Sequence, residues 1–180
     1  RWPTIYDFDQ LKNQIKRIVD SNYIRDFYTL SINEKELYQG DVLYLDKKFA
    51  FLNAEGNFEA VKFTRYWVIL GNSCDFSREV KDLPYTNIAP LQSIEKEIPE
   101  YIVTGLKNFQ NYKRMYFPNV GDDNLEYFLD FTQTMTISKQ FLENFGIDKL
   151  KKRELTHQGW VLLHSCLIRY FTRDDGRFDK

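Results

Sequence analysis

The chain has 180 residues and a formal net charge of −1, from 25 basic and 26 acidic residues. This length suits a single domain with a sizeable core, and a near-neutral chain has no overall field that draws it to nucleic acid. The longest apolar runs are far shorter than the roughly 20 residues of a membrane-spanning helix. Any nucleic-acid site must therefore be a local patch.

The two cysteines, Cys74 and Cys166, lie far apart in the sequence. They do not make a disulfide framework, so two reduced thiols in a cytoplasm are expected. The first residues also lack the basic start and apolar stretch of a secretory signal. We therefore expect a cytoplasmic protein.

The first 37 residues are expected to be helical. An amphipathic helix is predicted over residues 7–19, with Asp7 or Asp9 as its cap. Its apolar face is formed by Leu11, Ile15, Ile18 and Val19. Ser31 and Glu34 have the spacing of a capping box, which predicts a short turn of helix before Gly40.

From Asp41 onward the pattern changes to that of strands. Apolar and polar residues alternate over residues 41–63 around the turn-forming residues 53–57, which predicts a hairpin. Tyr66 to Leu70 has no polar interruption, as expected of a strand buried on both faces. A further strand is predicted from Thr86 to Leu91.

Helices are expected between and after the later strands. Helical spacing predicts an inserted helix over about residues 95–114. Residues 126–137 are predicted to form the last strand pair, and Ser138 then caps a short helix that ends before Gly146. The clearest helix is expected over residues 154–173. The fold class is therefore α+β.

Three motifs in the middle of the chain resemble the PemK/MazF family of toxin endoribonucleases. They are Gly40-Asp41-Val42, Arg65 leading Val68-Ile69-Leu70, and Ile88-Ala89-Pro90-Leu91 followed by Ser93. The resemblance implies a small, SH3-like, strongly bent antiparallel β-barrel that dimerises and cleaves single-stranded RNA without a metal. The single domain 1–180 is then expected to comprise a helical extension (1–37), the barrel (38–137) and C-terminal helices (138–173).

The resemblance also implies catalytic residues. Arg65 falls where the family has an Arg that stabilises charge on the phosphate, and a guanidinium suits this task because its planar donors hold two phosphate oxygens. Ser93 keeps a hydroxyl next to the place of the family's assisting Thr, which is Gln92 here. Tyr66 and Gly71 also depart from the family pattern, so binding without efficient cleavage is an alternative. A structural Arg65, neutralised by a nearby carboxylate, is another.

The loop after the buried strand carries Ser73, Cys74 and Asp75, with Arg78 nearby. A Cys nucleophile there would need a cation to stabilise its thiolate, and Arg78 is the candidate. The interpretation that we favour is an Asx-turn in which Asp75 bonds loop amides and Cys74 is buried.

Metal binding is not favoured by the sequence. His157, His164, Cys166 and Cys74 are candidate ligands, but no pair has the close spacing of zinc sites. No metal or cofactor is expected.

Two basic clusters are candidates for contacts with RNA. Lys107, Lys113 and Arg114 are expected on the inserted helix beside Tyr112, and single-stranded nucleic acid needs both phosphate neutralisation and stacking faces. The second cluster lies within residues 149–153. For both, a solvated helix face is the alternative.

The hypothesis is a bacterial or phage-borne RNA-binding protein that, on the resemblance, acts as a metal-independent endoribonuclease toxin. Its partners would be single-stranded RNA or a protein such as an antitoxin, and a homodimer is expected on the resemblance. A noncatalytic protein-interaction module on the same scaffold is the alternative, and a hydrolase based on Cys74 is a third hypothesis.

Overall fold

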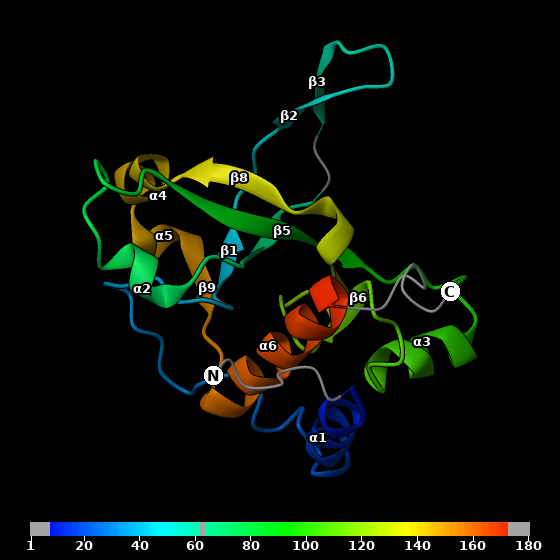
Figure 1. Cartoon of the computed structure of the whole chain (residues 1–180). Helices are drawn as coiled ribbons and strands as arrows, with labels where there is room; N and C mark the ends of the chain where they lie inside the picture. Colours follow the sequence, from blue (N-terminus) through cyan, green and yellow to red (C-terminus); the bar gives the residue numbers. More distant parts are fainter. Residues whose placement is uncertain (1–7, 62–63, 173–180) are drawn as a thin grey trace, which may run out of the picture.

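The computed structural model describes residues 8–61 and 64–172, and its centre is a seven-stranded antiparallel sheet (Figure 1). The strand order is β6-β7-β5-β4-β1-β9, and β8 pairs with the first part of β5. The strands are β1 (Val42–Tyr44), β4 (Tyr66–Ile69), β5 (Tyr85–Ser93), β6 (Arg114–Phe117), β7 (Tyr127–Asp130), β8 (Met135–Ser138) and β9 (Lys151–Arg153).

Helices surround this sheet, so the α+β class is confirmed. They are α1 (Phe8–Asp20), α2 (Ser73–Phe76), α3 (Glu100–Lys107), α4 (Lys139–Phe145), α5 (Ile147–Leu150) and α6 (His157–Thr172), and a 3-10 turn follows β7 at Phe131–Gln133. In the part of the chain that the structure describes, no helix has both the length and the apolar character to cross a membrane.

The two faces of the sheet carry separate apolar cores. Side chains alternate along a strand, so Val68 of β4 faces one core while Trp67 and Ile69 face the other. The first core takes in Ile15 of α1 and Leu163 of α6. The second takes in Leu142 of α4, Leu150 of α5 and Leu43 of β1. Helices thus cover both faces of the sheet.

A separate hairpin projects from the body between β1 and β4 (Figure 1). It pairs β2 (Phe49–Leu52) with β3 (Phe58–Val61) around the predicted turn 53–57, where Asn53 Oδ1 accepts from the amides of Glu55 and Asn57. The predicted hairpin over 41–63 was thus too long, since β1 pairs with β4 and β9 instead. Residues 62–63 lie outside the described part.

The sheet is not closed into a barrel, so the expected SH3-like barrel is not confirmed. Among the described strands no ladder joins the end strands β6 and β9. Segments outside the sheet lie next to these end strands. Helix α3 packs against β6, and Tyr28 forms a bridge with Leu155 just after β9. The sheet therefore stays open between its two ends.

Three local predictions were wrong. Residues 31–34 form no helix. Further along the same segment, the Tyr38 amide donates to Asp41 Oδ2 at 2.8 Å. The inserted helix ends at Lys107, and Arg114 begins strand β6. The basic cluster within 149–153 is not a solvated helix face, because Lys151 opens β9 with a buried side chain.

The other predicted helices are confirmed. The helix over 7–19 is α1, the helix capped by Ser138 is α4, and the C-terminal helix is α6. Ser138 Oγ accepts from the Phe141 amide, and Gly146 follows α4 with a φ of 96°, which suits glycine. Asp7 and Arg173 lie outside the described residues.

Candidate functional site

A cleft of about 380 Å³ opens at one edge of the sheet. Arg65 directly precedes β4 and Ser93 ends β5, and the two strands run antiparallel with Tyr66 opposite Leu91. Ser93 in turn lies opposite Tyr127, the first residue of β7. The strand register therefore brings Arg65 and Ser93 to the same cleft.

The Arg65 side chain is exposed in this cleft. Its backbone is fixed, because the Arg65 carbonyl accepts from the Leu45 amide at 2.8 Å. Within residues 8–61 and 64–172, no carboxylate lies at ion-pair distance from its guanidinium. The alternative of an Arg65 neutralised by a neighbouring carboxylate thus finds no support in the described contacts.

Three tyrosines form a row along the cleft. The ring centroids of Tyr44 and Tyr66 are 5.6 Å apart, and those of Tyr66 and Tyr127 are 5.5 Å apart, both in edge-to-face geometry. Tyr127 is buried, while the other two are half-buried. The Lys152 ammonium lies 6.0 Å from the ring centre of Tyr44. Two partly exposed aromatic rings thus share the cleft with Arg65, and Lys152 lies beside one of them.

The pKa values of two hydroxyls in this row, those of Tyr66 and Tyr127, are raised. Burial, then the charge of Asp123, raises the pKa of Tyr66. Burial, then the hydrogen bond that Tyr127 donates to Asp123 Oδ2 at 2.5 Å, raises the pKa of Tyr127 above its usual range. These two groups act as hydrogen-bond donors and not as general bases.

The cleft also holds two carboxylates, Glu95 and Asp123. Asp123 is fixed by Tyr127 and by the Leu125 amide, which donates to Oδ1 at 3.1 Å. Glu95 is exposed just after the end of β5. The side chain of Gln92 is held by Gln133, whose Oε1 accepts at 2.7 Å. A guanidinium, a hydroxyl and an exposed carboxylate therefore line one cleft, and such groups can respectively stabilise an anion, donate a hydrogen bond and accept a proton.

The predicted RNA-contacting residues of the 107–114 segment do not line this cleft. Lys107 pairs with Glu126 at 2.5 Å, and Arg114 pairs with Asp130 at 3.3 Å. Lys113 lies over the ring of Tyr112 at 5.6 Å. Two of the three cations are thus already neutralised, and the structure does not join this group to Arg65 and Ser93.

The loop candidates form helix α2 and the turn after it. Asn72, not Asp75, makes the Asx cap, since its Oδ1 accepts from the Cys74 amide at 3.1 Å. Cys74 is exposed, so its predicted burial was wrong. Ser73 Oγ accepts from the Gln39 amide, and Arg78 is exposed. Like Cys74, these side chains do not line the Arg65 cleft.

The candidate metal ligands are dispersed. Among the described residues, no three His, Cys, Asp or Glu side chains are placed to hold a metal ion. Cys166 is fully buried, and this burial raises the pKa of its thiol to about 12. His157 and His164 both contact Trp160, with ring centroids 5.9 Å and 4.7 Å away.

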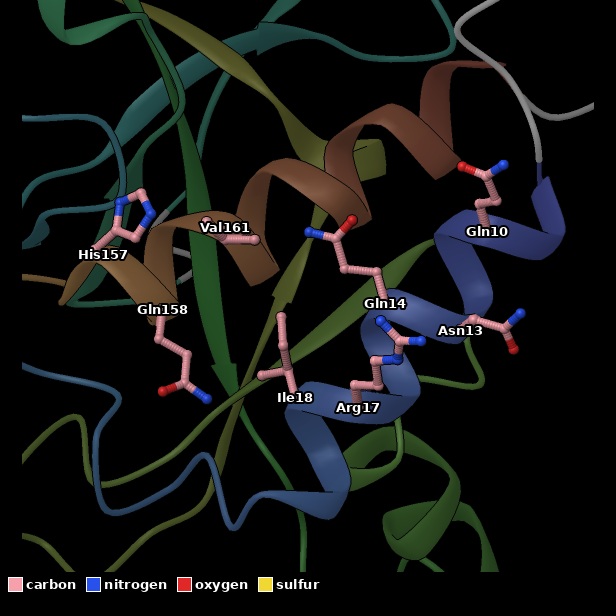
Figure 2. Close-up of a pocket in the computed structure, with 8 residues that line it drawn as sticks. All are labelled: Gln10, Asn13, Gln14, Arg17, Ile18, His157, Gln158 and Val161. Carbon is pink, nitrogen blue, oxygen red and sulfur yellow. The ribbon is translucent and has the colours of Figure 1, made fainter.

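A wider hollow of about 700 Å³ lies between α1 and α6 (Figure 2). Its polar lining consists mostly of amides, with Arg17 from α1 and His157 at the start of α6. Figure 2 shows His157 and Gln10 at opposite ends of this hollow. The Arg65 cleft instead combines an exposed guanidinium, a serine hydroxyl and two carboxylates.

Sequence reasoning missed six lining residues of the cleft: Tyr44, Thr64, Tyr66, Glu95, Asp123 and Tyr127. The available signal was weak, since each tyrosine lies at the end of a strand and only the register brings the three ends together. No protein-family model matches the chain, and a search of curated proteins found no match.

Proposed function

We propose that this protein binds single-stranded RNA in the Arg65 cleft and cleaves it without a metal, in the manner of the PemK/MazF-like barrels that its central motifs resemble. The observation that carries the proposal is that Arg65 and Ser93 line one cleft beside the tyrosine row. On this proposal the open sheet is a divergent form of that barrel, and the protein is a bacterial or phage toxin that acts in the cytoplasm.

The cleft offers a binding path for RNA. Bases stack on aromatic rings, and phosphates need cations along their track. Tyr44 and Tyr66 provide ring surface, while Arg65 and Lys152 flank them. The cleft lining holds one cation, Arg65, and the carboxylates of Glu95 and Asp123, so on this proposal the attraction for a phosphate depends on Arg65 itself and on Lys152 beside Tyr44.

The cleft groups also suit the cleavage step. The RNA 2′-oxygen attacks phosphorus, the bond from phosphorus to the 5′-oxygen breaks, and a cyclic phosphate and a 5′-hydroxyl result. Arg65 stabilises the charge that builds on the phosphate oxygens, and Ser93 donates a hydrogen bond. Glu95 takes the 2′-hydroxyl proton, and the leaving 5′-oxygen receives a proton from water or from the protonated Glu95.

The test is a cleavage assay with labelled single-stranded RNA in the presence of EDTA. We expect Arg65→Ala to abolish cleavage and Ser93→Ala to slow it about a hundredfold. The matched control is Arg78→Ala, because Arg78 is also exposed but does not line the cleft. Undiminished cleavage by Arg65→Ala would refute the catalytic proposal, and the absence of RNA binding by the unmodified chain would refute both parts.

A second candidate is a noncatalytic protein-interaction module, with an antitoxin-like protein as partner. The observation that favours it is the projecting hairpin, where Leu52 and Phe58 are paired and are 61% and 81% exposed. An isolated two-stranded ribbon is marginal in water and gains stability from a partner. RNA binding that falls steeply with salt would favour the first candidate over this one.

A further inference from the structure

A second hollow, of about 520 Å³, lies between α1, α6 and the turn 108–110. It shares no lining residue with the Arg65 cleft. Three cations line it, Lys12 and Lys16 from α1 and Arg169 from α6, against the single carboxylate of Asp20. The hollow is therefore positively charged although the chain is nearly neutral.

Arg169 is held in a fixed position, and among the residues that the structure describes no carboxylate pairs with it. Its Nη1 donates to the Phe109 carbonyl at 2.5 Å, and its Nη2 donates to the Asn111 carbonyl at 2.9 Å. Its Nε is buried and has no hydrogen-bond partner. Neutral carbonyls do not cancel the guanidinium charge, so Arg169 keeps its positive charge at the hollow that it lines.

The two lysines complete one rim of the hollow. They are four residues apart on α1, so both ammonium groups project from the same side of the helix. Lys16 pairs with Asp20 at 2.6 Å, but both side chains are largely exposed, and such a pair opens at little cost. Within the described part of the chain, no carboxylate lies at ion-pair distance from the Lys12 ammonium.

Beneath this rim the hollow is apolar. Ile15, Val19 and Phe109 line it together with the cations. An inorganic anion would use the rim alone, whereas a ligand with a phosphate and a flat ring would use both parts. Asp20 adds an acceptor for hydroxyl or amino donors, which a nucleoside carries and an acidic peptide side chain lacks. The volume is also in the range of small-molecule sites.

From these observations we infer a binding site for a nucleoside monophosphate group, with the phosphate between Lys12, Lys16 and Arg169 and the base against the half-buried Val19. The group belongs either to a free nucleotide or to the phosphorylated 5′ end of an RNA. The site is separate from the Arg65 cleft and does not depend on RNA cleavage there.

Calorimetric titration of the full chain with AMP tests the site. AMP is expected to bind saturably with one site per chain, and adenosine and inorganic phosphate are each expected to bind at least tenfold more weakly. Lys12→Gln and Lys16→Gln should each weaken AMP binding roughly tenfold, because each removes a charge-assisted hydrogen bond. Lys149→Gln is the matched control, since Lys149 is an exposed lysine on α5 that does not line the hollow.

Both substituted lysines are exposed, so these variants should fold as the unmodified chain does. The absence of saturable AMP binding would overturn the inference, as would equal affinity for AMP and adenosine or full affinity in both lysine variants. RNA hexamers with and without a 5′-phosphate distinguish a free nucleotide from an RNA end as the ligand. If the phosphorylated hexamer binds more tightly than AMP, and this preference depends on Lys12 and Lys16, the ligand is an RNA end. Arg65→Ala should leave AMP binding unchanged, which separates this test from that of the cleft.

Discussion

Replacing Asp41 by Asn should change how stability depends on pH. Asp41 lies in a buried cluster in which the Lys151 ammonium is 2.8 Å from Asp41 Oδ2 and 2.7 Å from Glu154 Oε2. Two carboxylates thus share one cation, and Asp41 Oδ1 is buried without a hydrogen-bond partner. Burial outweighs the opposing attraction of Lys151 and raises the pKa of Asp41 to about 7.

The sign of the effect follows from proton binding. In the unfolded chain Asp41 titrates near 3.8, the ordinary pKa of an Asp side chain, whereas in the folded chain it titrates near 7. Between these values the folded state holds a proton that the unfolded state has lost, so the free energy of unfolding falls as pH rises through this window. About three pKa units at about 1.4 kcal/mol each give a loss of about 4 kcal/mol at most.

Urea denaturation of both proteins between pH 5 and pH 8 measures this contribution. The difference in unfolding free energy, wild type minus Asp41→Asn, should fall as pH rises, since the other titrating groups are common to both proteins and cancel. Asp148→Asn, at an exposed position on α5, is the control and should track the wild type. Parallel curves for wild type and Asp41→Asn, or a difference that grows with pH, would refute the reasoning.

Two further substitutions test single contacts. Lys139 is 1% exposed and donates to the carbonyls of Asp75 and Arg78. Lys139→Met should therefore lower the unfolding free energy, measured by urea denaturation, by about 1–3 kcal/mol. Lys149→Met is the control and should have little effect. A Cβ at Gly121 would lie 2.6 Å from the Tyr66 hydroxyl, so Gly121→Ala should displace Tyr66. It should weaken RNA binding several-fold in fluorescence anisotropy yet cost less than about 1 kcal/mol of stability; unchanged affinity would remove Tyr66 from the proposed binding path.

The parts of the fold that sequence predicted well have local causes. Strand β4 was recognisable because both of its faces are buried, and α4 because Ser138 and Gly146 mark its ends. Strand β9 was not, since its residues Lys151 to Arg153 are all basic. The Lys151 side chain can be buried because it pairs with Asp41 and Glu154. A pattern of neighbouring residues does not reveal a partner as distant in sequence as Asp41.

The residues of the candidate site also fall into those that the sequence could predict and those that it could not. Arg65 and Ser93 were singled out by motif, and in the structure Arg65 directly precedes β4 while Ser93 ends β5. Tyr44, Tyr66 and Tyr127 come from three strands, and aromatic residues in strands are most often core residues. Their meeting in one row depends on the β1–β4–β5–β7 register, in which a slip by one residue would turn each ring to the opposite face.

The position of the cleft follows from how the sheet is covered. Helices α1 and α6 pack on one face and α4 and α5 on the other, so neither face offers room for a polymer. Polar groups therefore become accessible where strands end. At one such edge Arg65 has no carboxylate partner among the described residues, whereas on the outer strand β6 Arg114 is neutralised by Asp130. On the proposed function a phosphate needs a cation that is not already paired, which Arg65 offers and Arg114 does not, so the Arg65 edge is the place to test for RNA.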